Sequence, residues 1–227
     1  MKKVVIGFVV AMIGGVICFA GIKAGEKNDG IENVDMVLQT SEESGWIGEK
    51  VIGDVDKAKL VIYEYADFGC SHCAEQNRKV NDLMRKHDGE IVVVFRAYDL
   101  GFQNGAFAAR AATAAQLQGY FDKYKDLLFN NQVEWAYEKG EDLNGLLVRY
   151  FEEASGGVGD VRKFREDMKS DAVKKRLLFE QKIGKKVNLR GTPLFRINGE
   201  SVPNGELIER VEDILKNWMR CKKAGVA

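Results

Sequence analysis

The sequence predicts an α/β fold in which a central β-sheet carries an inserted module of helices. Two β-prone runs, at 60–65 and 91–95, are almost continuously apolar, as is typical of strands covered on both faces. Between them, residues 71–87 place apolar side chains at helical spacing and complete a βαβ unit. Residues 99–190 then show helical periodicity almost throughout, which predicts a helical insertion within a domain spanning 48–227.

Composition supports one principal folded domain. Of the 227 residues, 45% are hydrophobic and 30% are charged, which is far from the composition of disordered chains. Lysine plus arginine and aspartate plus glutamate both number 34, and no long block of one charge stands out. Nucleic acid is therefore not an expected partner.

The N-terminal segment predicts export. Lys2 and Lys3 precede an uncharged, mostly apolar run at 4–22, which as a helix would span roughly 29 Å, close to the ~30 Å of a bilayer core. Residues 1–22 therefore predict a signal anchor, and the alternative is a signal peptide cleaved near 18–20. Both place the domain outside the cytoplasm, in the periplasm or outside the cell, and the anchor would hold it at the cell membrane.

The next segment, at 23–47, is rich in glycine, serine and acidic residues and lacks sustained periodicity. This composition predicts a solvated linker between the membrane and the domain.

Within the insertion, residues 105–129 begin with an alanine-rich stretch and predict either two helices or one bent helix. Apolar residues at i, i+3, i+4, i+7 and i+8 predict a helix over 143–151, with Gly156 and Gly157 as stop signals. A further helix is expected over 161–177.

After the insertion, residues 194–202 predict a hairpin, because Asn198-Gly199 tolerates the positive φ angles of a tight turn. An amphipathic helix at about 205–218 is expected to close the domain.

The cysteines are too few for a disulfide-stapled miniprotein and lie at 18, 70, 73 and 221. Only Cys70 and Cys73 are close in sequence. With two histidines in the chain and no second CxxC, a zinc site lacks ligands, so no metal is expected. Cys18 is interpreted as an apolar filler, with lipidation as the alternative. Cys221 is interpreted as a spare thiol or, alternatively, half of an intermolecular disulfide.

The pair at 70 and 73 predicts reversible disulfide chemistry. Cys70 lies where a helix begins, so unpaired backbone N–H groups and the helix dipole favour its thiolate. Cys73 lies one turn later on the same face, and His72 between them would further stabilise the anion. A substrate thiolate would attack Cys70, and Cys73 would resolve trapped mixed disulfides, without a cofactor.

Two other features accompany the pair. Glu64 lies in an otherwise apolar strand, where an unpaired carboxylate is costly, and is interpreted as a buried proton acceptor serving Cys73; the alternative is a residue at a solvent-facing edge. Thr192-Pro193 precedes a strand, and a cis bond there would be a deliberate feature, since only about 5–6% of X-Pro bonds are cis.

Three separated motifs together resemble the DsbA family of thioredoxin-fold disulfide oxidoreductases, in its membrane-anchored bacterial form. The resemblance covers roughly 51–215. Its motifs are Tyr63-Glu64-Tyr65-Ala66-Asp67-Phe68-Gly69-Cys70-Ser71-His72-Cys73, the stretch from Ala106 to Gln132 containing Asp126-Leu127-Leu128-Phe129, and Gly191-Thr192-Pro193-Leu194-Phe195.

The resemblance implies a thioredoxin-like central sheet with an inserted helical domain. It also implies a nucleophile at Cys70, a resolving thiol at Cys73, an acidic partner at Glu64, and a cis-proline loop, Thr192 and Pro193, lying against the disulfide. Ser71 departs from the family, which commonly has proline there, whereas His72 keeps the family residue. The departure bears on oxidising strength.

The leading functional hypothesis is an oxidase that donates the Cys70–Cys73 disulfide to exported or unfolded protein thiols and is reoxidised by a membrane redox partner. One alternative is an envelope disulfide reductase or isomerase. Another is a chaperone-like binding module that holds unfolded chains at an exposed aromatic neighbourhood of Phe68.

Overall fold

The computed structural model describes residues 10–13, 16–19, 41, 43–45 and 47–223. From residue 50 onward its elements are β3 (Lys50–Ile52), β4 (Leu60–Ala66), α2 (Ser71–Lys86), β5 (Ile91–Ala97), α3 (Gly105–Gln116), α4 (Phe121–Asn130), α5 (Gln132–Trp135), α6 (Gly140–Ser155), α7 (Val161–Asp167), α8 (Asp171–Lys186), β6 (Leu194–Ile197), β7 (Glu200–Val202), the 3₁₀ turn η1 (Asn204–Glu206) and α9 (Leu207–Lys223).

The sheet places β4 at its centre. The strand order is β3-β5-β4-β6-β7, with β4 and β5 parallel and the other pairs antiparallel. Side chains alternate along β4: Ile62 and Ala66 join the core with α2, α4 and α9, whereas Tyr63 and Tyr65 join a second cluster that includes Leu189. The predicted strands and the helix that connects them are confirmed.

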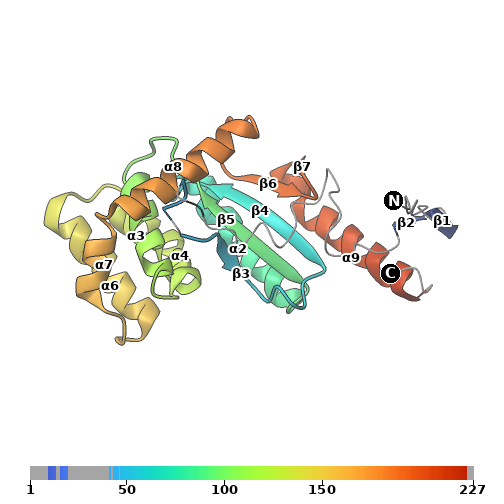
Figure 1. Ribbon diagram of the computed structural model, residues 1–227, viewed down its shortest axis with the longest axis horizontal. Coiled ribbons are helices and arrows are strands. Elements are labelled where there is room, and N and C mark those ends of the chain that lie inside the picture. The colour runs from blue at the N-terminus through green and yellow to red at the C-terminus, as the bar shows by residue number, and fades with distance from the viewer. Residues whose placement is uncertain (1–9, 14–15, 20–40, 42, 46, 224–227) are drawn as a thin grey trace, which may run out of the picture.

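The helices α3 to α8 follow β5 and precede β6 in the chain. Figure 1 shows α3, α4, α6 and α7 grouped beyond one end of the sheet, with α9 toward the other end and α8 running back toward β6. Stacked Phe151 and Phe164, with ring centroids 4.2 Å apart, help to join α6 to α7. The predicted fold class, a sheet with an inserted helical module, is confirmed.

Helix boundaries inside the insertion follow local capping. Residues 105–129 contain two helices rather than one bent helix. The single helix expected over 161–177 is wrong: α7 and α8 are separate, because Ser170 accepts a hydrogen bond from the Val173 N–H at 3.2 Å and starts a new helix.

Two glycine signals were interpreted correctly. Helix α6 ends at Gly156, whose φ of 62° is in the left-handed region. In the hairpin of β6 and β7, Asn198 and Gly199 have φ values of 51° and 80°, as a tight turn between twisted strands requires.

The helix expected over 4–22 is wrong where the structure describes that run. Strands β1 (Val10–Ile13) and β2 (Val16–Phe19) pair antiparallel there. Valine and isoleucine favour strands and glycine disfavours helices, so local propensity opposes the length argument for an anchor. No helix in the described part of the chain is long and apolar enough to span a membrane.

The prediction of a solvated linker over 23–47 is wrong for its last residues, because residues 43–47, where described, pack on the domain. Ser44 and Ile47 are buried, and the Ile47 carbonyl accepts a hydrogen bond from Arg176 at 3.1 Å. Gly45 has a φ of 65° and passes so close to Ala172 that a Cβ would lie 2.4 Å from its carbonyl oxygen. These contacts join residues 43–47, where described, to α8.

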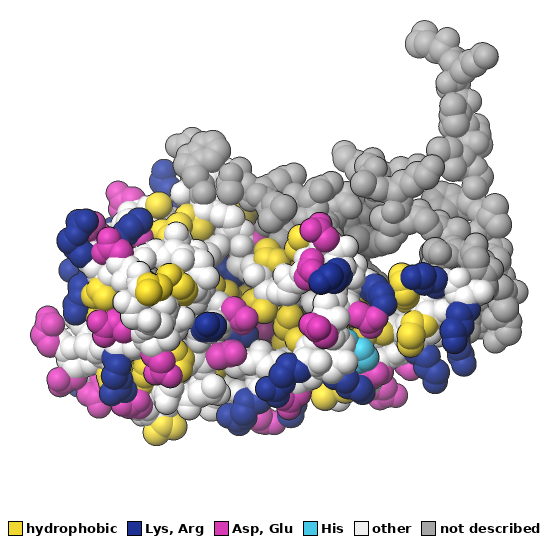
Figure 2. All heavy atoms as spheres, turned by 90° about the horizontal axis from the view of Figure 1, so that it is seen from below, with side chains coloured by type: hydrophobic (Ala, Val, Ile, Leu, Met, Phe, Trp, Pro, Cys, Tyr) yellow, Lys and Arg dark blue, Asp and Glu magenta, His cyan; other side chains and the backbone are white. Residues whose placement is uncertain are grey.

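The described surface mixes both signs of charge. Figure 2 shows lysine and arginine side chains interspersed with aspartate and glutamate on the face in view. Several charged residues form ion pairs within single helices, such as Lys79 with Glu75 and Arg162 with Glu166, and such pairs contribute little to stability when exposed.

Candidate active site

The turn after β4 places Cys70 at the start of α2. The Cys70 N–H donates to the Asp67 carbonyl at 3.0 Å, and Cys70 is the N-cap residue of the helix, with φ −83° and ψ 120°. The first turn of α2 carries no acid, and its last turn contains Arg85 and Lys86. The positive end of the helix dipole therefore acts on the Cys70 sulfur.

Cys70 and Cys73 form an asymmetric pair of free thiols. Cys70 is 7% exposed and Cys73 is fully buried. A hydrogen bond from the Cys73 thiol, together with the backbone N–H groups of Cys73 and His72, lowers the pKa of Cys70 from 9.0 to about 5. The same hydrogen bond, with burial, raises the pKa of Cys73. The Cys70 sulfur can therefore act as a nucleophile or a leaving group, whereas the Cys73 thiol keeps its proton.

The loop before β6 lies against the pair. The Thr192–Pro193 peptide bond is cis, and the Thr192 carbonyl oxygen lies 3.5 Å from the Cys70 sulfur, which donates to it when protonated. The Thr192 hydroxyl is buried and makes no regular hydrogen bond within the described residues, yet it lies near enough to lower the pKa of both thiols.

Ser71 and His72 lie on the surface of the first turn, where both side chains are exposed. What His72 supplies to Cys70 is its backbone N–H. The stabilising role predicted for the imidazole ring stays a prediction.

Glu64 is buried in the central strand β4, between Phe95 of β5 and Phe195 of β6. The alternative of a solvent-facing edge position is therefore wrong. Neither carboxyl oxygen has a hydrogen-bond partner among the described residues. Burial raises the pKa of Glu64 to about 7, although the nearby Lys125 lowers it. This carboxyl can accept or release a proton near neutral pH.

The charged groups that act on Glu64, Lys125 and Asp126, come from α4 of the helical insertion. Lys125 of α4 is fully buried, and its ammonium lies 3.3 Å from the Asp126 carboxylate, which is 34% exposed. The Asn77 and Asn81 amides of α2 donate to the same carboxylate at 3.0 and 2.9 Å.

Two residues that the sequence interpretation did not select also contact the site. The Gln132 amide at the start of α5 donates to the Phe68 and Cys70 carbonyls at 2.5 and 3.1 Å. The sequence does not reveal this contact of Gln132, because no local signal links residue 132 to residue 70. Asp67 accepts two backbone hydrogen bonds, from Gly69 and Leu100, and an aspartate just before CxxC is a detectable turn signal.

The expected exposure of Phe68 is wrong. Its ring is 1% exposed, stacks on Phe129 with centroids 4.9 Å apart, and lies 5.3 Å from the ring of Phe95. The aromatic residue that precedes the CxxC is therefore core packing, and the chaperone-like alternative loses the surface on which it depended.

Cys221 is not the spare thiol that was expected. It is buried in α9 and its sulfur is in a disulfide. Its chemistry is thereby separated from that of the free pair at 70 and 73.

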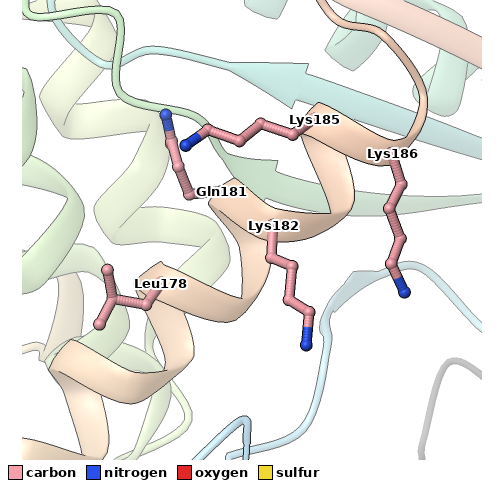
Figure 3. Close-up of a pocket in the computed structure, with 5 residues that line it drawn as sticks. All are labelled: Leu178, Gln181, Lys182, Lys185 and Lys186. Atoms are coloured by element: carbon pink, nitrogen blue, oxygen red, sulfur yellow. The ribbon is translucent and has the colours of Figure 1, made fainter.

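A surface hollow of about 430 Å³ lies on α8, lined by Leu178, Gln181, Lys182, Lys185 and Lys186 (Figure 3). Leu178 is 69% exposed, and the Lys182 ammonium is 3.0 Å from the Glu43 carboxylate. None of the residues that surround Cys70 lines it, so it is a solvated helix face apart from the thiol site.

Comparison with known families identifies the class. The sequence model of the family described as "Thioredoxin" matches residues 46–217. The chain belongs to this family.

Solved structures share the fold. Oxidised BdbD of Bacillus subtilis has a TM-score of 0.63 at 19% identity, covering 80% of this chain and 97% of that one. A thioredoxin-like oxidoreductase of Silicibacter pomeroyi has a TM-score of 0.61 at 22% identity, with 81% and 98% coverage. Alpha-DsbA1 of Wolbachia pipientis has a TM-score of 0.60 at 20% identity, with 78% and 94% coverage. The fold is therefore thioredoxin-like with a helical insertion, as in DsbA-like structures.

The chain spans about a fifth of the length of the curated relatives it matches. The Na(+)/H(+) antiporter NhaA 1 of Mycolicibacterium vanbaalenii is 28% identical over 148 residues, which are 63% of this chain and 22% of that protein. NhaA of Herminiimonas arsenicoxydans is 31% identical over 144 residues, with 63% and 21% coverage. This partial likeness brings no transport activity to the chain.

Proposed function

We propose that this chain is a thiol-disulfide oxidoreductase that acts mainly as an oxidase, donating a Cys70–Cys73 disulfide to the thiols of exported or unfolded proteins. The observation that carries the proposal is the asymmetry of the pair: the pKa of Cys70 is lowered to about 5 and that of Cys73 is raised. At pH 7 a pKa about two units below ambient stabilises the reduced form by about 2.7 kcal/mol, equivalent to about 60 mV.

The thiol-disulfide exchange has two steps. A substrate thiolate attacks Cys70 Sγ of the oxidised pair, the Cys70–Cys73 bond breaks, and Cys73 leaves and takes up a proton. A second substrate thiolate attacks the substrate sulfur of the mixed disulfide, and Cys70 leaves as the stabilised thiolate. The substrate loses two electrons and the pair gains them. Glu64, buried on the face of the sheet that α2 covers, is the proposed proton donor and acceptor for Cys73.

We propose that the work is done outside the cytoplasm. Support comes from Lys2 and Lys3 followed by the apolar run 4–22, and from a polar, glycine-rich stretch that begins at residue 23. A membrane redox partner reoxidises the pair. Cell fractionation with mass measurement of the N-terminus tests the export and shows whether the run is kept as an anchor or cleaved; an uncleaved chain in the cytoplasm contradicts the proposal.

The direction of exchange is tested by the reduction potential of the purified protein and by alkylation trapping in cells. An oxidase has a potential well above the roughly −270 mV of a cytosolic thioredoxin and is trapped mainly as the disulfide. A potential near that of thioredoxin, with the pair trapped reduced, would support the reductase or isomerase alternative. The double variant Cys70→Ser, Cys73→Ser keeps the other cysteines and is the matched control for their contribution.

A further inference from the structure

Asp67 connects two loops that are distant in the sequence. It is 2% exposed and lies in the turn between β4 and α2. Its Oδ1 accepts a hydrogen bond from the Gly69 N–H at 2.8 Å, and its Oδ2 accepts one from the Leu100 N–H at 2.7 Å. One carboxylate therefore binds the turn that carries Cys70 and the loop that follows β5.

The packing around this carboxylate leaves no room for side chains. A Cβ on Gly69 would lie 2.3 Å from the Phe102 carbonyl oxygen, and a Cβ on Gly105 would lie 2.2 Å from Asp67 Oδ1. Real Cβ atoms do not approach so closely, so position 69 requires glycine, and a side chain at position 105 would displace the Asp67 carboxylate. The two loops thus meet backbone to backbone, with Asp67 beside the contact.

The loop that Asp67 holds presents apolar side chains next to the Cys70 turn. Leu100 is 38% exposed and Phe102 is 42% exposed. The far end of the loop is also held, because the Asn104 amide donates to the Trp135 and Glu138 carbonyls at 2.9 and 2.8 Å. We expect a polypeptide that delivers a thiol to Cys70 to contact this surface, whereas a small thiol does not need it.

We propose that Asp67 is a positioning residue that sets the preference of Cys70 for polypeptide thiols over small thiols, by holding the Leu100–Phe102 loop against the Cys70 turn. This inference rests on the proposed function. The carboxylate is needed because two different oxygens bind the two N–H groups. An asparagine amide or a serine hydroxyl has a single acceptor oxygen and so does not place one at both N–H groups.

The test compares Asp67→Asn and Asp67→Ser with the control Asp99→Asn. Asp99 is an exposed carboxylate in the same loop whose Oδ1 accepts from the Gly101 N–H at 2.8 Å, so Asp99→Asn removes the same charge without releasing the Cys70 turn. Each oxidised protein is reduced in parallel by an unfolded cysteine-containing peptide and by glutathione, and the two rate constants are measured.

Both Asp67 variants should slow the peptide reaction about tenfold or more, because small misplacements of a binding surface cost that much. The ratio of the peptide rate constant to the glutathione rate constant should therefore fall about tenfold in both Asp67 variants, because any release of the Cys70 turn affects both thiols alike. Both reactions of Asp99→Asn should stay within about twofold. In the Asp67 variants the Leu100 amide should also exchange its hydrogen faster. Equal losses with both thiols, or no loss, would overturn the inference.

The two proposals fail in different ways. If the oxidised wild-type protein is reduced by neither thiol, the proposed function is wrong. If the wild type reacts with both and its preference survives in the Asp67 variants, only the positioning role is wrong. Asp67→Ser has a smaller side chain that fits beneath Gly105, so it keeps the test decisive if Asp67→Asn folds poorly.

Discussion

Two glutamates, Glu64 and Glu180, are fully buried in this fold, and their pKa values are shifted in opposite directions. Glu180 of α8 accepts hydrogen bonds from the Lys50 ammonium, from the Arg176 guanidinium at 2.6 Å and from the Ala97 N–H at 2.8 Å. Burial by itself would raise the pKa of Glu180, but Lys50 and Arg176 outweigh it and lower that pKa. Glu64 has no hydrogen-bond partner among the described residues, and its pKa is raised to about 7.

The difference separates a carboxylate that is held in ion pairs from a carboxyl group that can exchange a proton near neutral pH. Glu180 joins β3, β5 and α8, and its partner Arg176 also binds Glu49, so this charge network fastens the insertion to the sheet. A glutamate with those partners cannot take up a proton near neutral pH. Glu64 lacks such partners among the described residues, which costs stability and leaves a carboxyl that can titrate near pH 7.

The largest expected effect is the loss of stability when the paired charge of Glu180 is removed. Glu180→Gln should lower the free energy of unfolding by about 3–5 kcal/mol, because it leaves Lys50 and Arg176 buried without their shared anion. Glu64→Gln should change it by less than about 1 kcal/mol at pH 5, where Glu64 is already neutral.

Urea unfolding of the oxidised proteins measures both, with Glu166→Gln as the control for an exposed helical pair. An equal loss of stability in the Glu64 and Glu180 variants would contradict this difference between the two carboxyl groups.

The pH dependence of stability should show Glu64 directly. Its folded pKa of about 7 lies above its ordinary value of 4.5, so its contribution is fully present below pH 4.5 and is lost as pH rises through 7. The loss should reach about 3 kcal/mol. The contribution of Glu180 to stability depends on pH in the opposite direction, since it is lost as pH falls through the lowered pKa of Glu180.

Unfolding of the oxidised wild type and Glu64→Gln across this pH range measures the difference, with Cys70 unable to titrate. Parallel curves for the two proteins would show that Glu64 does not titrate as expected.

A smaller effect is expected from Lys125, the cation that lowers the pKa of Glu64. Lys125→Met keeps the apolar stem and removes the charge, so the pKa of Glu64 should rise further, by about one unit. Carboxyl NMR titration measures it. Lys123→Met, an exposed change on the same helix, should leave that pKa in place, and equal shifts in both variants would assign the effect to general charge.

The smallest effect should be at Thr192. Thr192→Val removes a hydroxyl that lowers the pKa of Cys70, so this pKa should rise from about 5 by a few tenths of a unit. Ultraviolet absorbance of the thiolate against pH measures it. Thr113→Val is the matched control, because the Thr113 hydroxyl is buried in α3 and donates to the Ala109 carbonyl at 2.8 Å. A fall in the pKa of Cys70 in Thr192→Val would contradict the effect expected of the hydroxyl.

Local signals predicted much of this molecule. Strands at 60–65 and 91–95, the helix that begins at Cys70, the Asn198-Gly199 turn and the stop at Gly156 each depend on propensities or caps within a few residues. Where two local signals competed, prediction failed, as at 161–177, where Ser170 starts a second helix, and in the described part of 4–22, which pairs as strands.

The sequence by itself determined the α/β class, the insertion and the placement of a cysteine pair at a helix start, because these follow from short-range periodicity and backbone geometry. Only the tertiary structure decided which buried charges are paired. Lys50 meets Glu180, and Asp67 reaches Leu100, across long stretches of chain. Desolvation and hydrogen bonding depend on which groups meet in space, and residue spacing along one strand or helix does not contain that information.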